Sequence, residues 1–113
     1  MDQERTIFDT DRHTQQASEA FILRLGRLLH QHGAPADRLE SDLDSTARAL
    51  GLAAQFLSTP TGLQLAFGGL DEQRVHLLRM ELGDASLGKL CEVHEIARAV
   101  ETGEVEPDAG LAA

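Results

Sequence analysis

The chain has 113 residues, of which 42% are hydrophobic, and a formal net charge of −9. This length suffices for one domain with its own core. The acidic excess argues against a nucleic-acid partner or an anionic membrane surface, because both are bound through lysine and arginine. The chain start lacks a signal peptide's basic-then-apolar pattern, and no apolar run approaches the roughly 20 residues of a membrane span. We therefore expect a soluble chain.

Residues 1–17 are mostly polar and show no apolar periodicity, which predicts a flexible lead-in whose Phe8 could pack onto the domain. A helical pattern starts at Ala17. Its apolar positions are Phe21, Leu25, Leu28 and Leu29. Gly33 follows this run and is expected to end the helix, because glycine adopts the left-handed conformation at little cost.

A second helix is expected from Pro35 to about Leu50. The fixed φ of Pro35 suits the first helical turn, and Gly51 ends the pattern. Its apolar stripe contains Leu39, Leu43, Ala47 and Leu50. The two-residue link between the helices predicts an antiparallel or steeply crossed pair.

The apolar period then changes to two, which predicts strands over residues 54–59, 63–68 and 74–79. A hairpin turn is expected between the first two strands. There, Pro60 cannot donate a ladder hydrogen bond and Gly62 tolerates positive φ. Such short links between strands predict an antiparallel three-stranded meander.

Ser86 or Asp84 is expected to cap a further helix that Gly103 ends. Its apolar positions are Leu87, Leu90, Val93, Ala97 and Val100. Pro107 then marks the first turn of a short last helix. The predicted fold class is α+β: two N-terminal helices, a three-stranded antiparallel meander, and one or two C-terminal helices packed on one sheet face. We expect residues 18–113 to form this domain.

Several segments carry a resemblance to a known family. They are Phe21–Gly26 leading to His32–Pro35, Leu39 to Leu52, Thr59–Gly62 in the hairpin, the Arg74–Arg79 strand, and Leu87–Leu90. Their combination and spacing, over about residues 18–112, resemble the soluble N-terminal domain of the threonine/serine exporter family.

This resemblance implies a bacterial inner-membrane exporter of small hydroxy amino acids, in which a cytoplasmic domain precedes a hydrophobic transport domain. The sequence contains no transmembrane helix. It is therefore either a part that ends before the transport domain or a stand-alone copy. The expected role is non-catalytic regulation or assembly of the transport domain, without a cofactor. The expected partners are that transmembrane domain, threonine or serine, and a second copy, with no nucleic acid.

The hydroxyl-rich turn is the candidate ligand site. Ser58, Thr59 and Thr61, together with Arg79, could bind the carboxylate or hydroxyl of an amino acid. The alternative is that these hydroxyls serve strand and turn geometry. Four arginines could also bind a carboxylate. The alternative is that they lie on solvent-exposed faces. They are Arg24, Arg27, Arg74 and Arg79.

Cys91 and His94, three residues apart on one helix, are weak metal candidates, with Glu95 as a third ligand. His30 and His32 point to different sides of a helix and make a poor metal pair. The lone cysteine fits a reducing compartment.

No residue is assigned a catalytic role. The alternative function is a small hydrolase in which His32 or His94 activates a hydroxyl of the Thr59–Thr61 turn or a cysteine thiol. That alternative requires a histidine nitrogen about 3 Å from the hydroxyl or thiol.

Overall fold

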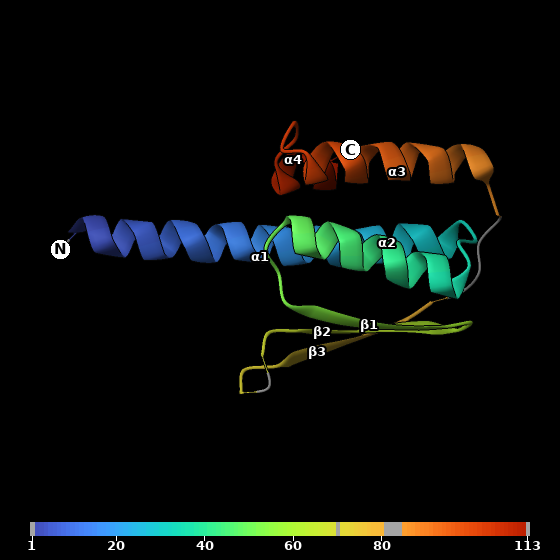
Figure 1. Ribbon diagram of the computed structural model, residues 1–113, viewed down its shortest axis with the longest axis horizontal. Helices are drawn as coiled ribbons and strands as arrows, with labels where there is room; N and C mark the ends of the chain where they lie inside the picture. The colour runs from blue at the N-terminus through green and yellow to red at the C-terminus, as the bar shows by residue number, and fades with distance from the viewer. Residues whose placement is uncertain (1, 70, 81–84, 113) are drawn as a thin grey trace.

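The computed structural model describes residues 2–69, 71–80 and 85–112. It forms three layers (Figure 1): a sheet, a pair of helices over one of its faces, and two further helices over that pair. The elements are α1 Asp2–Gln31, α2 Ala36–Ala49, β1 Ala54–Thr59, β2 Gly62–Phe67, β3 Arg74–Arg79, α3 Leu87–Glu101 and α4 Pro107–Ala112. The predicted α+β class and element order are confirmed.

α1 begins at Asp2 rather than at Ala17, so its first turns extend beyond the rest of the molecule (Figure 1). The expectation of a lead-in without helical structure over residues 1–17 is therefore wrong from Asp2 onward. An apolar stripe indicates that one face of a helix is buried, and a helix that is exposed all round need not have one. Residues 2–16 contain no proline or glycine, and they add helical turns to a nucleus that the buried part of α1 already supplies.

The link between α1 and α2 depends on Gly33, which has a φ of +90°. The next amide, Ala34 N, donates to Leu29 O at 3.0 Å and so satisfies a carbonyl at the end of α1. Pro35 takes the N-cap position of α2, one residue before the expected first turn. The two helices then pack against each other as predicted.

The sheet has the order β1-β2-β3 and is antiparallel throughout. Alternate residues of β2 point toward the helices and are buried: Leu63, Leu65 and Phe67. All four helices lie on this side of the sheet (Figure 1), as predicted. α3 and α4 pack on α1 and α2 rather than on the strands, and so form an outer layer.

The hairpin turn consists of Pro60 and Thr61, and Thr59 pairs with Gly62. Gly62 does not adopt the positive φ that glycine tolerates, since its φ lies outside that region. Glycine is required there for another reason. A Cβ at Gly62 would lie 2.9 Å from Leu78 O, because the backbone of β3 approaches this end of β2 closely.

The core is mainly aliphatic, with Phe21 and Phe67, and draws on α1, α2, β2 and α3. Its largest fully buried side chains are Phe67, Ile22, Leu29, Leu39, Leu43, Leu63 and Leu65. In α3, Val93, Ala97 and Val100 are buried as expected, whereas Leu87 in the first turn is 82% exposed. The Ser86 hydroxyl accepts from Lys89 N at 3.2 Å, which confirms Ser86 as the cap. Asp84, the alternative, lies outside the described residues.

Candidate functional site

The polar groups of the predicted turn site take part in the fold itself. Ser58 N donates to Glu40 Oε1 at 2.8 Å, so a side chain of α2 satisfies this amide of β1. Thr59 Oγ1 donates to Gly62 O at 3.2 Å and closes the turn. Thr61 O accepts from Met80 N at 2.9 Å. Two of these three bonds use main-chain groups, so among the side chains of the predicted site only the Thr59 hydroxyl makes a described hydrogen bond.

The sheet register brings only part of the predicted set together. Gly62 pairs with Thr59 on one side and with Arg79 on the other, so these three residues form one row across the sheet. Thr59 and Arg79 are exposed at the two ends of this row, on the face away from the helices. The side chain of Ser58 points to the opposite face, because successive side chains alternate along a strand.

His30, in the last turn of α1, contacts the hairpin turn from the helix side of the sheet. Its ring is buried, and Nε2 lies 2.9 Å from Thr59 O. Since a carbonyl oxygen only accepts, Nε2 is the donor. The histidine that reaches the turn is thus His30, and neither His32 nor His94 does so among the described hydrogen bonds.

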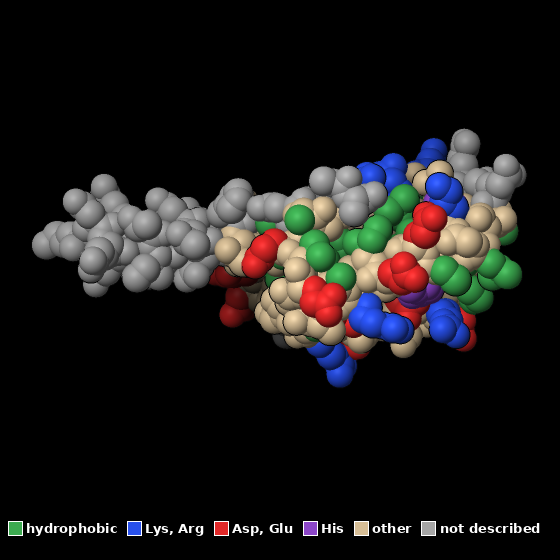
Figure 2. Space-filling view, turned by 90° about the horizontal axis from the view of Figure 1, so that it is seen from above, with side chains coloured by type: hydrophobic (Ala, Val, Ile, Leu, Met, Phe, Trp, Pro, Cys, Tyr) green, Lys and Arg blue, Asp and Glu red, His purple; other side chains and the backbone are tan. Residues whose placement is uncertain are grey.

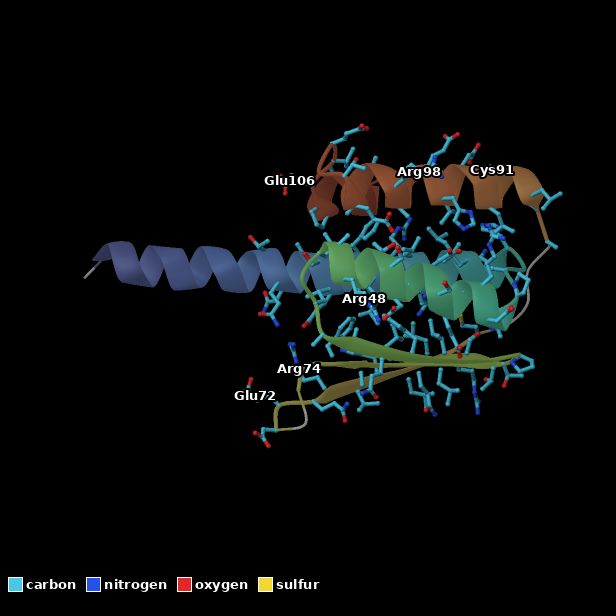
Figure 3. The ribbon with its side chains drawn as sticks, in the orientation of Figure 1. Arg48, Glu72, Arg74, Cys91, Arg98 and Glu106 are labelled. Atoms are coloured by element: carbon cyan, nitrogen blue, oxygen red, sulfur yellow. The ribbon has the colours of Figure 1, made fainter. Side chains whose placement is uncertain are left out.

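α2 and α3 enclose a polar groove of about 460 Å³. His94 Nε2 donates to Asp42 Oδ2 at 2.8 Å, and Thr46 Oγ1 donates to Glu101 Oε1 at 2.6 Å. Cys91 and Arg98 also line the groove from α3 (Figure 3). These bonds fasten the outer layer to α2.

The metal and hydrolase hypotheses each require particular side chains to lie close together. The described side chains contain no cluster of three residues able to hold a metal, and Cys91 is exposed. In the described hydrogen bonds, His30 and His94 meet a carbonyl and a carboxylate, not a hydroxyl or thiol. The distance that the hydrolase alternative requires is thus not seen in this part of the chain.

A second cavity, of about 400 Å³, lies where α1 passes the loop between α2 and β1. Its wall contains Glu19, which is only 8% exposed. Arg74 Nη2 donates to Glu19 Oε1, and Gln15 Nε2 donates to the same oxygen at 3.3 Å. Figure 3 shows Arg74 at the start of β3, on the side of the sheet next to α1.

This cavity was not predicted from the sequence. Arg74 is one of the four arginines expected to be able to meet a carboxylate, but its partner Glu19 lies 55 residues away in the chain. One feature of the sequence does indicate this cavity. Ser18 precedes Ile22 by four residues and Leu25 by seven, so a polar side chain lies on the apolar stripe of α1.

The structure thus defines an α+β domain in which all the helices cover one face of a short meander. Residues 20–113 match the family ThrE, described as "Putative threonine/serine exporter". The chain belongs to this family, and the resemblance is confirmed.

The matching relatives include much longer fungal proteins. The chain is 36% identical over 84 residues to an uncharacterized protein of Schizosaccharomyces pombe, covering 73% of this chain and 11% of that protein. It is also 36% identical to pheromone-regulated membrane protein 10 of Candida albicans, over 73% of this chain and 8% of the relative. For the same-named Saccharomyces cerevisiae protein the identity is 36%, over 81% of this chain and 12% of the relative. The chain thus spans about a tenth of each relative's length.

The resemblance implied a bacterial protein, whereas these relatives are fungal. No solved structure matches the chain. Within the described residues, every helix is too short or too polar to cross a membrane.

Proposed function

We propose that this chain is a non-catalytic, cytoplasmic domain that regulates or assembles the transport part of a threonine/serine exporter. Family membership over residues 20–113 supports this role. So do the relatives named as membrane proteins, in which the matched segment is a small fraction of the length. In such a protein the domain has a large neighbour within the same polypeptide.

The observation that carries the proposal is the outer face of the sheet, which points away from α1 and α2. Three large aliphatic side chains are exposed on it: Leu57 by 53%, Val75 by 66% and Leu77 by 70%. They come from both edge strands, and the central strand contributes Gln64 and Ala66 between them. A hollow of about 290 Å³ crosses this face. Large exposed aliphatic side chains gathered on one face are typical of an interaction site.

The size of the outer sheet face favours the transport part of the same exporter over a second copy. Three strands of six residues cover about 300 Å² at ordinary strand spacings. A stable complex between separate proteins buries about 800 Å² per partner. A covalently linked neighbour needs less area, because the linkage raises its effective concentration.

The test replaces the two most exposed residues of this face, Val75→Gln with Leu77→Gln, in a threonine/serine exporter that carries this domain. Surface changes alter stability by about 0.5 kcal/mol or less, so the domain should stay folded. Export of labelled threonine from loaded cells should fall several-fold, because the domain loses its contact with the transport part.

Leu87→Gln is the matched control, since Leu87 is equally large and exposed but lies on α3. This variant should export at the unaltered rate. Unchanged export in the double variant, at equal protein level, would contradict the proposal. A shift from dimer to monomer in the isolated chain would instead assign the outer sheet face to self-association.

A further inference from the structure

We infer that the cavity beside Glu19 binds a small zwitterion, a free amino acid with a hydroxyl-bearing side chain. The cavity chemistry rests on Glu19, Arg74 and Ser18. The choice of threonine and serine as probes rests on the exporter role proposed above. The site lies on a different part of the molecule from the outer sheet face, so the two proposals can fail separately.

Glu19 supplies the acceptor for an ammonium group. Both of its described hydrogen bonds, from Arg74 and Gln15, end on Oε1. Oε2 accepts no described hydrogen bond, and it is not among the buried atoms that are sealed from solvent without a partner. Glu19 lines the cavity, so the inferred ligand would meet it at this second oxygen. A carboxylate oxygen in this position can accept from an ammonium group.

Arg74 supplies the donor for a carboxylate. One of its nitrogens, Nη2, is engaged by Glu19, and its side chain is still 51% exposed. The guanidinium carries five N–H groups in a planar fork, so it has donors left for a second carboxylate. Arg74 lines a hollow of about 350 Å³ that shares Gln15 and Gly68 with the Glu19 cavity. A ligand across the two hollows therefore meets Glu19 with its amine and Arg74 with its carboxylate.

Ser18 supplies the contact to a side-chain hydroxyl. The residue is only 3% exposed, it lines the same cavity, and its hydroxyl makes no hydrogen bond to a described residue. Its hydroxyl is not among the buried atoms that are sealed from solvent without a partner, so a ligand hydroxyl in the cavity can bond to it. The cavity volume lies within the range of about 300–1,000 Å³ that is typical of small-molecule sites.

Stability alone does not explain why Glu19 is buried here. A buried ion pair is often no more stabilising than apolar residues of the same size. A pair of opposite charges in the wall of a cavity can instead fix the orientation of a polar ligand. The pair also joins α1 to β3, so ligand binding there would change a contact between two layers of the fold.

The experiment is isothermal titration calorimetry of the chain with L-threonine and L-serine at up to about 10 mM, a range that detects millimolar affinities. We expect both to bind. Alanine should bind about fivefold more weakly, because it leaves the Ser18 hydroxyl unsatisfied. N-acetylthreonine and threonine amide, which each lack one charge of the zwitterion, should bind at least tenfold more weakly.

Glu19→Gln and Arg74→Gln should abolish binding, whereas Arg79→Gln, at the predicted turn site, should leave it unchanged. Ser18→Ala serves as a second variant if the charge-neutralised proteins unfold. It should keep the fold and remove the preference for threonine over alanine. No heat with either amino acid would overturn the inference, as would binding that survives all three changes. Binding lost in Arg79→Gln alone would assign the ligand to the turn instead.

Discussion

Gly62 opens β2 at a point where the backbone of β3 passes close to it. A Cβ there would lie 2.9 Å from Leu78 O, and a backbone atom in a sheet ladder cannot move aside as a side chain does. We therefore predict that Gly62→Ala lowers the free energy of unfolding by about 1–3 kcal/mol, the usual cost of overpacking. Urea denaturation of the chain measures this difference.

Gly69 provides the comparison, because a Cβ there would meet no atom within 4 Å and its φ is not positive. Gly69→Ala should change the free energy of unfolding by no more than about 0.5 kcal/mol. Equal effects of the two substitutions would show that backbone entropy, not the approach of β3, explains Gly62.

Thr46 joins two elements, α2 and α3. Its side chain is buried, and its hydroxyl donates to the Glu101 carboxylate at 2.6 Å. Thr46→Val keeps the shape but leaves that carboxylate oxygen without its donor. Hydrogen bonds to charged groups contribute about 1.5–3 kcal/mol, so we predict a loss of unfolding free energy in this range by thermal or urea denaturation.

Thr102→Val is the control, since Thr102 is exposed and its hydroxyl bonds only to Ala99 O, in its own helix. Its effect should stay below about 0.5 kcal/mol. If both variants unfold at the same midpoint, the Thr46–Glu101 contact does not hold α3 on α2.

The elements that the sequence predicted well are those with a clear period. The stripe of Leu39, Leu43 and Ala47 identified α2, and the alternation around Leu63, Leu65 and Phe67 identified β2. Both patterns arise from burial of one face. The start of α1 was missed because residues 1–17 show no apolar period, although the helix begins at Asp2.

The candidate site was less predictable than the fold, for a physical reason. Glu19 and Arg74 are 55 residues apart, and only the packing of α1 beside the sheet brings them together. The density of hydroxyl groups pointed instead to Thr59 and Thr61, and the Thr59 hydroxyl bonds to Gly62 O within the turn. Ser18 on the buried stripe of α1 was the one local signal of the cavity.

In the molecule as a whole, the two faces of the sheet have different surroundings. The helices cover one face of the sheet and leave the other bare (Figure 1), while α3 presents charged side chains of both signs to solvent (Figure 2). The outer sheet face carries Leu57, Val75 and Leu77, and it is the apolar surface we assign to the transport part of an exporter. The Glu19 cavity lies on the other side of the sheet, near its end.

Site-specific photo-cross-linking tests the central claim most directly. A photo-reactive amino acid replaces Leu77 in a threonine/serine exporter that carries this domain, and Leu87 in a parallel sample. After illumination in intact cells, the account predicts that position 77 forms a cross-link to the membrane-embedded part and that position 87 does not. Cross-links of equal yield from both positions, or none from position 77, would contradict the account.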